Sequence, residues 1–376
     1  MPFERIDLRL RHTGLEEAVC KTVDHLREGK IVVLPTETVY GLAVRAQDED
    51  AVDRLVQLKG RTEGHPFALA FSGINAVLDF VPDMSDLAFR LARRCWPGPI
   101  SLVLDASDRG SEFHSLPKSV RNIVSLASTV SFRIPNHLLT LTALGELNEP
   151  IVLTSANRSG RGEAATTEEI IAELGSGIDL LVDDGSIVDA KPSTVIKVDG
   201  NSYSILREGA VKQATVERLT ARMILFVCTG NTCRSPMAER ICELLLARRL
   251  ECSVDELENR GFVVLSAGIA AGYEAPASAY AQSVMRNKGI DLSDHRSQQL
   301  NETHVRFADH IFTMTRGHRE AILSYWPSAD TRLNVLRLDG GDISDPLGGS
   351  EGVYDTCARQ LEDEIAKRLD EILSSP

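Results

Sequence analysis

The sequence has no long apolar run. None approaches the roughly 20 residues that a membrane-spanning helix requires, and the opening stretch, MPFERIDLRLRHTG, lacks the apolar segment of a secretory signal. We therefore expect a cytoplasmic protein that does not enter a membrane. The seven cysteines are odd in number and scattered, which excludes the disulfide framework of a small secreted domain and predicts free thiols.

Basic charge is also in short supply. The chain carries 41 Lys and Arg residues against 54 Asp and Glu residues, a formal net charge of −13. Up to Lys212 there are 23 basic and 30 acidic residues, and the remainder has 18 and 24, so the two halves carry −7 and −6. Neither half has the basic excess that tight, salt-sensitive binding to nucleic acid requires. We expect small molecules and proteins as partners, and no tightly bound nucleic acid.

Internal repeats and low-complexity segments are absent, and 376 residues correspond to two or three domains. The second half alternates apolar, strand-like runs with amphipathic, helix-like stretches. The predicted strands are 223–228, 261–268, 310–314 and 333–338, and the predicted helices are 236–250, 276–288, a segment after Gly317, and 353–373. This strand-helix alternation predicts an α/β domain with a parallel four-stranded sheet over residues 223–376.

The first half is less regular and predicts an α+β domain with a mixed, twisted sheet over residues 1–212. The predicted strands are 31–35, 100–104, 128–135, 150–157 and 193–198, and the predicted helices are 15–28, 48–59 and 167–174. Between the halves, a short polar stretch predicts a linker at 213–222.

Residues 228–236 read CTGNTCRSP and follow the apolar run MILFV. Gly230 and Asn231 tolerate unusual backbone angles, and the Ser-Pro pair that begins with Ser235 is a natural helix opening. Cys228 therefore lies at a helix N-terminus, where unpaired N–H groups and Arg234 favour an anion and a thiolate. This pattern predicts that Cys228 attacks phosphorus while the Arg234 guanidinium binds two phosphoryl oxygens.

A covalent phosphoryl transfer also needs a proton donor for the leaving group and a base for water. Asp345, in the loop DISDPLGGS after the strand at 333–338, is the candidate for both roles. The alternative that Cys228 and Cys233 bind zinc lacks a second Cys/His pair with ligand spacing, so we expect no metal there.

Together with CTGNTCRSP, the segments SAG (266–268), GIDLSDHRSQQL (289–300) and DPLGGS (345–350) resemble the low-molecular-weight protein tyrosine phosphatase family across 223–374. The resemblance implies Cys228 as nucleophile, Arg234 as phosphate clamp and Asp345 as acid and base, without a cofactor. It also implies a phosphate loop whose remaining residues support the site and set its specificity: Thr229, Gly230, Asn231, Thr232, Cys233 and Ser235.

The substrate class remains open between two phosphoryl groups. Family members that act on phosphotyrosine have a bulky aliphatic residue in place of Thr232 and aromatic residues after the Asp-Pro pair. Here Thr232 and the Leu-Gly-Gly at 347–349 resemble the protein-arginine phosphatase branch, so we favour phosphoarginine over phosphotyrosine. Arsenate reductases of this fold need a cysteine relay, and Cys242, Cys252 and Cys357 lack the close pairing of such a relay.

The first half contains PTETVYGLA (35–43), a Lys-x-Arg pair, WPGP (96–99), RIP (133–135), TSAN (154–157) and STV (193–195). No GxxxxGK[ST] is present, which excludes a P-loop NTPase. Small polar and basic groups at strand ends are typical of a site for a triphosphate. The candidate residues are Lys59, Arg61, Arg133, Arg207, Ser155 and Asn157.

These motifs resemble the YrdC family of threonylcarbamoyl-AMP synthases over about 10–212. The resemblance implies synthesis of threonylcarbamoyl-adenylate from L-threonine, bicarbonate and ATP with Mg²⁺, for threonylcarbamoyl-adenosine in tRNA, and proteins of tRNA modification as partners. It places Lys59, Arg61, Arg133, Ser155, Asn157 and Ser193 at the nucleotide, and Thr36 and Tyr40 at threonine. The sequence departs from the family at His65-Pro66-Phe67 and at Ala70, which puts rate and substrate preference in question.

The sequence thus predicts a bifunctional enzyme, a nucleotidyltransferase fused to a phosphoprotein phosphatase. The alternative is a tyrosine phosphatase regulated by a non-catalytic N-terminal module that binds a nucleotide or RNA.

Overall fold

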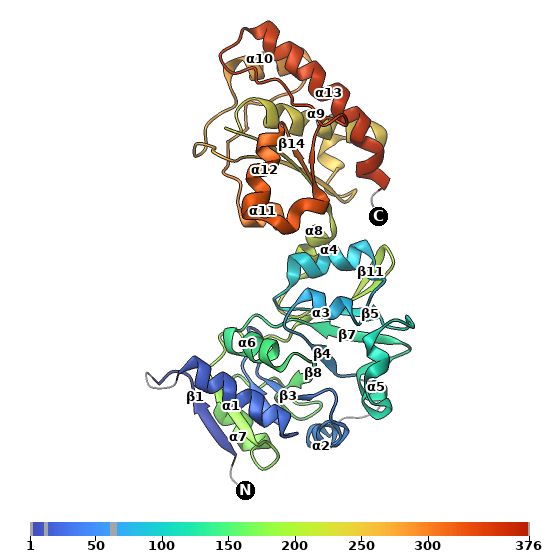
Figure 1. Ribbon diagram of the computed structural model, residues 1–376, viewed down its shortest axis with the longest axis vertical. Coiled ribbons are helices and arrows are strands. Elements are labelled where there is room, and N and C mark those ends of the chain that lie inside the picture. Colours follow the sequence, from blue (N-terminus) through green and yellow to red (C-terminus); the bar gives the residue numbers. More distant parts are fainter. Residues whose placement is uncertain (1–2, 11–13, 61–65, 375–376) are drawn as a thin grey trace. The chain divides into compact units, whose positions relative to one another are not determined.

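The computed structural model describes residues 3–10, 14–60 and 66–374 (Figure 1). Contacts divide the chain into two compact units, Met1–Val216 and Glu217–Pro376. The stretch predicted to be a linker contains helix α8 (Gln213–Thr220), and the boundary between the units falls within this helix. Among the described residues, no helix combines the length and the apolar character needed to cross a membrane.

The first unit is built on one mixed sheet, as the sequence predicts. Its strands lie in the order β1-β9-β2-β3-β8-β4-β7-β5-β10-β11, and β6 pairs with β7. Their bounds are β1 (Glu4–Asp7), β2 (Val32–Leu34), β3 (Gly41–Arg45), β4 (Ala68–Ala70), β5 (Ile100–Asp105), β6 (Ser125–Leu126), β7 (Thr129–Arg133), β8 (Ile151–Ser155), β9 (Leu180–Asp183), β10 (Thr194–Asp199) and β11 (Ser202–Arg207). Pairs such as β1 with β9 are parallel, whereas β3 with β8 and β10 with β11 are antiparallel.

Helices cover this sheet and bury its apolar side chains. They are α1 (Leu15–Arg27), α2 (Glu49–Lys59), α3 (Ile74–Leu78), α4 (Asp86–Cys95), α5 (Lys118–Val124), α6 (Leu138–Leu147) and α7 (Thr167–Leu174). Val23 of α1 and Leu144 of α6 belong to one core cluster with Val32 and Leu34 of β2, so these two helices cover the same part of the sheet (Figure 1). This packing fixes the strand ends from which the candidate nucleotide residues project.

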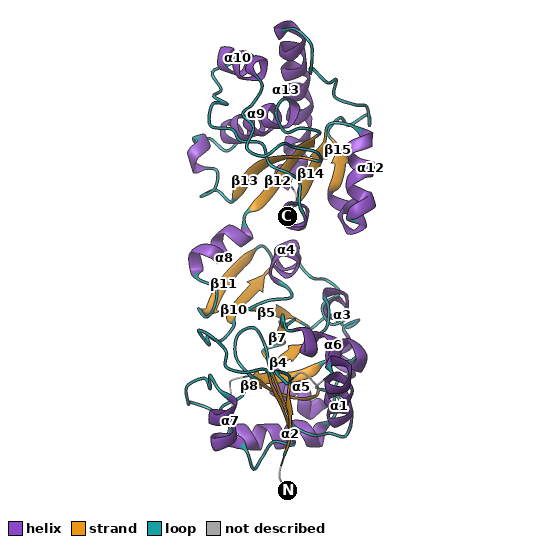
Figure 2. Cartoon of the chain, turned by 90° about the vertical axis from the view of Figure 1, so that its left-hand side faces the viewer, coloured by secondary structure: helices purple, strands orange, loops and turns teal. Residues whose placement is uncertain are grey.

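The second unit has the parallel four-stranded sheet that the sequence predicts, in the order β13-β12-β14-β15 (Figure 2). The strands are β12 (Arg222–Cys228), β13 (Phe262–Gly268), β14 (His310–Thr313) and β15 (Leu333–Val335), and each neighbouring pair is parallel. The helices are α9 (Arg234–Arg249), α10 (Ala279–Asn287), α11 (Glu302–Phe307), α12 (Arg316–Tyr325) and α13 (Glu351–Ser374).

Strand β12 is buried on both faces, which explains its unbroken apolar sequence. Ile224 and Phe226 join the core cluster formed with α9, α10 and α13, whereas Leu225 and Val227 join the cluster on the opposite face with α11 and α12. Because the strand occupies an interior position of the sheet, its end places Cys228 at the carboxyl edge, where the connecting loops converge.

Two candidate active sites

The phosphate loop joins the end of β12 to the start of α9. Asn231 lies in the left-handed region, with φ of 53°, so the loop turns sharply around the cysteine sulfur. The backbone N–H of Asn231 donates a hydrogen bond to Cys228 Sγ at 3.2 Å, and Ser235 Oγ lies 3.0 Å from the same sulfur. The loop thus directs one backbone N–H and one serine hydroxyl group at the buried sulfur.

The side chain of Asn231 holds the loop in this shape. Its Nδ2 donates to Ser235 Oγ at 2.9 Å and to Ser266 Oγ at 2.8 Å, and its Oδ1 accepts from the N–H of Gln298 at 2.9 Å. Its backbone carbonyl lies 2.8 Å from His295 Nε2. Asn231 is fully buried, and every one of these contacts fixes backbone or side chains rather than leaving a group for substrate.

A half-buried glutamate, Glu239, lies at the end of this hydrogen-bond network. Ser266 Oγ donates to Glu239 Oε2 at 2.5 Å, and burial raises the pKa of Glu239 to about 7. Sequence analysis assigned no role to Glu239 or Ser266, although Ser266 begins the SAG segment. Ser266 links Glu239 to Asn231, so Glu239 supports the loop through the hydrogen-bond network that these three side chains form.

The two remaining catalytic candidates of the phosphatase half contact each other. Arg234 donates through Nη2 to Asp345 Oδ2 at 2.5 Å and through Nη1 to the carbonyl of Ile343 at 3.2 Å. Arg234 is buried, whereas about half of the Asp345 side chain is exposed. The guanidinium that the sequence predicts to bind phosphate is thus paired with the carboxylate that the sequence predicts to be the acid.

Thr229 and His318 form a second link to the phosphate loop. Thr229 Oγ1 lies 2.9 Å from His318 Nε2. Burial lowers the pKa of His318 to about 4, and the cation of Arg234 acts in the same direction. His318 is therefore neutral at neutral pH and adds no charge next to the site.

The specificity candidate Thr232 and its neighbour Cys233 follow Asn231 in the loop. Thr232 is half-buried, its carbonyl accepts from the N–H of Ser278 at 2.8 Å, and its Oγ1 lies 3.7 Å from Cys233 Sγ. A Cβ added at Gly230 would lie 3.6 Å from Thr232 Oγ1, so the threonine hydroxyl turns back across the loop. Cys233 Sγ is 3.3 Å from the hydroxyl of Tyr354.

All seven cysteines are free, as predicted. Burial raises the pKa of Cys357 to about 12 and also raises that of Cys242, so neither thiol is reactive near neutral pH. In the part of the chain that the structure describes, no group of three or more His, Cys, Asp or Glu side chains could hold a metal ion. The zinc alternative therefore finds no ligand set among these residues.

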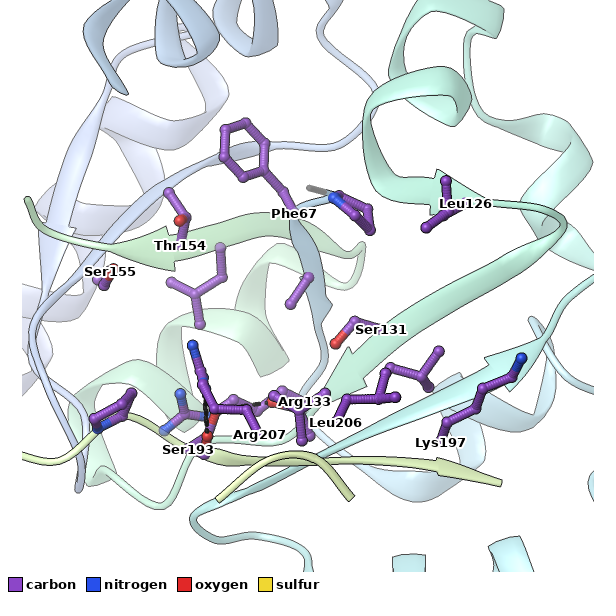
Figure 3. A pocket seen from close by; sticks show the side chains of 18 of the residues that line it. Phe67, Leu126, Ser131, Arg133, Thr154, Ser155, Ser193, Lys197, Leu206 and Arg207 are labelled. Atoms are coloured by element: carbon purple, nitrogen blue, oxygen red, sulfur yellow. Dashed lines mark hydrogen bonds between the residues drawn. The ribbon is translucent and has the colours of Figure 1, made fainter. Parts of the chain in front are cut away.

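The first unit contains a cavity of about 560 Å³, a size typical of small-molecule sites (Figure 3). Five of the residues predicted from the sequence line it: Thr36, Arg133, Ser155, Ser193 and Arg207.

Arg133 and Arg207 both bring positive charge to this cavity. Arg133 donates through Nη2 to Thr38 Oγ1 at 2.5 Å and to Glu37 Oε1 at 3.1 Å, and its Nε is buried without a partner. Arg207 donates through Nη2 to the carbonyl of Ser193 at 2.8 Å. Burial lowers the pKa of Arg207, and nearby Arg133 contributes to the same shift. Two adjacent guanidinium groups, seen beside Ser193 in Figure 3, attract a polyanion.

Other predicted residues do not line the cavity. The ammonium of buried Lys59 donates to the carbonyls of Ser155 at 2.8 Å and Asn157 at 2.6 Å, and to Asn157 Oδ1 at 3.0 Å. Lys59 and Asn157 thus stabilise the TSAN turn through hydrogen bonds and do not line the cavity. Arg61 and the departure at His65 lie outside the described residues, and direct contact of Lys59 with phosphate stays a prediction.

Tyr40 is also placed away from the cavity. Its hydroxyl donates to the carbonyl of Gly185 at 2.7 Å and accepts from the N–H of Asp184 at 2.9 Å, and burial raises its pKa to about 12. In this structure Tyr40 supports the backbone at 184–185 rather than lining the cavity.

Several lining residues were missed from the sequence, among them Ser101, Ser131, Glu163 and Lys197. One signal was available for Lys197. Along β10, Val195 and Lys197 line the cavity while Ile196 and Val198 are buried in the core, which is the period-two alternation of a strand.

The raised pKa of Glu239 predicts how the stability of the second unit depends on pH. Because the folded state binds this proton more tightly, the stabilisation is complete below the unfolded pKa of about 4.5 and is lost as pH rises through about 7. The shift corresponds to roughly 3 kcal/mol. We expect Glu239→Gln to flatten the fall in the free energy of unfolding between pH 5 and 8, measured by hydrogen exchange of peptides from 223–374 in the full chain. Exposed Glu320→Gln is the control; a wild-type slope retained by Glu239→Gln contradicts the assignment.

Comparison with known proteins assigns both units. Residues 24–209 match the Sua5/YciO/YrdC family profile, described as "Telomere recombination", and residues 223–375 match "Low molecular weight phosphotyrosine protein phosphatase". The protein-arginine-phosphatase of Geobacillus stearothermophilus is 40% identical over 156 residues, which are 39% of this chain and 95% of that protein.

The threonylcarbamoyl-AMP synthase of Pyrococcus abyssi is 32% identical over 194 residues, which are 52% of this chain and 54% of that protein. The chain therefore spans about half the length of this relative, but it covers 90% of a shorter relative from Mycobacterium tuberculosis at 30% identity. A solved structure of a P. abyssi Sua5 variant shares the fold, with 22% identity, a TM-score of 0.51, and coverage of 81% of this chain and 94% of that one. The chain belongs to two families: its first unit to the Sua5/YciO/YrdC family and its second to the low-molecular-weight phosphotyrosine protein phosphatases.

Proposed function

We propose that the chain is a bifunctional enzyme, a threonylcarbamoyl-AMP synthase followed by a phosphatase of arginine-phosphorylated proteins. The observation that carries the phosphatase half is the sulfur of Cys228, which receives the N–H of Asn231 and lies beside the hydroxyl of Ser235. The observation that carries the synthase half is the cavity that Arg133 and Arg207 share.

In the first phosphatase step, the Cys228 thiolate forms a bond to phosphorus as the bond to the leaving group breaks. Arg234 holds two phosphoryl oxygens, and Asp345, displaced from Arg234, gives its proton to the departing nitrogen or oxygen. In the second step Asp345 removes a proton from water, which attacks the phosphocysteine. Inorganic phosphate leaves, and the Cys228 thiolate returns.

The preference for phosphoarginine rests on two features of the site. Thr232 offers a hydroxyl to the polar phosphoguanidinium group, where an aliphatic side chain would leave its N–H groups unpaired. After Asp345 and Pro346 comes Leu347, which is 73% exposed and followed by two glycines, so this loop provides no aromatic wall for a phenyl ring. The similarity to the protein-arginine-phosphatase of Geobacillus stearothermophilus supports the same preference.

In the synthase half, ATP is the polyanion that the cavity accommodates, with Mg²⁺ shielding its phosphates. L-threonine and bicarbonate supply the carbamate that attacks the α-phosphorus, and pyrophosphate leaves. Ser193 and Ser155 line the same cavity and offer hydrogen bonds to the adenylate. The product serves the modification of tRNA, which makes proteins of that pathway the expected partners.

The ion pair of Asp345 predicts opposite effects on turnover and on phosphate binding. Asp345→Asn removes the acid and should lower kcat by about 10²- to 10⁴-fold on substrates with poor leaving groups. It also removes the carboxylate that competes for Arg234, so inorganic phosphate should inhibit the variant at lower concentration. Steady-state kinetics and product inhibition measure both, with Cys228→Ser as the inactive blank. An unchanged kcat assigns the acid to another residue.

Substrate preference is tested at Thr232. We expect Thr232→Ile to lower kcat/KM for a phosphoarginine peptide and to raise it for a phosphotyrosine peptide of the same sequence, by about tenfold in the ratio. Phosphate release from the two peptides, measured in parallel with the full chain, gives this ratio. If the ratio stays at the wild-type value, specificity lies in another part of the site.

The synthase half is tested by pyrophosphate release. The full chain should release pyrophosphate from ATP only when L-threonine and bicarbonate are both present. Arg207→Gln should reduce the rate at least tenfold, because it removes a cation worth about 1.5–3 kcal/mol in its charged hydrogen bonds. Exposed Arg109→Gln is the matched control. A chain that binds ATP but releases no pyrophosphate would favour the alternative of a regulatory nucleotide-binding module.

A further inference from the structure

Glu163 is the acidic residue among the described residues that line the nucleotide cavity. The cavity otherwise gathers cations, namely Arg133, Lys197 and Arg207. Glu163 follows the TSAN turn and comes from a segment that sequence analysis did not connect with the site. A single carboxylate in a cavity built for a polyanion has an unfavourable position, because it repels the phosphates that the cations attract.

The hydrogen bonding of Glu163 makes this position costly. Its Oε2 is buried and has no hydrogen-bond partner, although a buried carboxylate oxygen normally has at least one. Arg207 lies near enough to interact electrostatically with Glu163, yet its guanidinium is directed to Ser193. Glu163 thus lines the cavity with a carboxylate whose hydrogen bonding is incomplete, and a cation or a donor that enters the cavity can complete it.

We propose that Glu163 is the protein ligand of the Mg²⁺ ion that ATP carries into this cavity. The inference rests on the proposed binding of ATP by the first unit. A divalent cation resolves both observations at once, since it binds the free carboxylate oxygen and converts repulsion between Glu163 and the phosphates into attraction.

The chemistry of Mg²⁺ supports a site of this composition. The ion usually keeps several waters and binds through one or two carboxylates together with substrate phosphates, rather than in a cage made only of protein. Among the described residues no group of three or more His, Cys, Asp or Glu side chains could hold a metal. The cavity thus fits an ion that arrives with the nucleotide and leaves with pyrophosphate.

Two other groups compete for the same oxygen, and they make different predictions. The ribose hydroxyls of the nucleotide and the amino group of threonine are both donors. A hydroxyl acceptor strengthens nucleotide binding with or without metal, and an acceptor for threonine changes threonine binding alone. Only if Glu163 binds the metal does its carboxylate strengthen nucleotide binding in the presence of the metal and weaken nucleotide binding in its absence.

The test measures binding, so it needs no turnover. Full-length wild type and Glu163→Gln are titrated with α,β-methylene ATP, once with Mn²⁺ as a paramagnetic substitute for Mg²⁺ and once with EDTA. Calorimetry gives the Kd, and electron paramagnetic resonance counts the bound Mn²⁺. We expect Glu163→Gln to bind the Mn²⁺-nucleotide at least about tenfold more weakly, and the metal-free nucleotide equally or more tightly, because a repelling charge is gone.

The exposed Glu146→Gln variant is the matched control and should equal wild type in both titrations. Glu163→Asp keeps the charge and should retain the preference for the metal-bound nucleotide, which separates the metal role from misfolding. Weaker binding of Glu163→Gln in both titrations, or no change in either, overturns the proposal. Pyrophosphate release is measured separately. Metal-dependent nucleotide binding without pyrophosphate release supports the role of Glu163 and rejects the synthase. Pyrophosphate release at the same rate in wild type and Glu163→Gln supports the synthase and rejects the role of Glu163.

Discussion

The phosphate loop depends on one backbone constraint, the left-handed conformation of Asn231. A loop that directs its N–H groups at a sulfur must turn tightly, and this turn requires one residue at positive φ. Most residues adopt that conformation only at a cost in free energy. Asn231 tolerates that conformation, and its side chain is bound by Ser235, Ser266 and Gln298, so the turn is held before any substrate arrives. Preorganised donors of this kind cost no rearrangement during the reaction.

In the first unit, a buried cation stabilises a turn. The TSAN turn leaves carbonyl oxygens pointing into the protein, and the ammonium of Lys59 binds those of Ser155 and Asn157 together with Asn157 Oδ1. Burying a charge is unfavourable unless it is paired or hydrogen-bonded, and here three acceptors satisfy it. In both units, then, a buried polar side chain shapes a turn while other residues face the ligand.

The sequence predicts the second sheet well, but it predicts five of the eleven described strands of the first sheet and only part of the sites, for a physical reason. Strand β12 carries a clear apolar pattern and helix α13 a clear amphipathic one. The alternation of such stretches predicts the parallel sheet of the second unit. Helix α6 was missed because LLTLTALGEL is apolar on all sides and shows no helical period. Cys228, Arg234 and Asp345 were predicted because motifs contain them. Glu239 and Glu163 were not, because their roles arise from burial and from neighbours distant in the chain, which no local pattern records.

The pairing of Arg234 with Asp345 has a consequence for the end of each catalytic cycle. In the mechanism proposed above, the substrate exchanges places with a carboxylate that is tethered to the same domain and is therefore present at a high effective concentration. In the same proposal, that carboxylate returns to Arg234 after the reaction and competes with the bound inorganic phosphate. Asp345 would then act as an internal inhibitor that weakens the binding of product and substrate alike and clears the site for the next phosphoryl group.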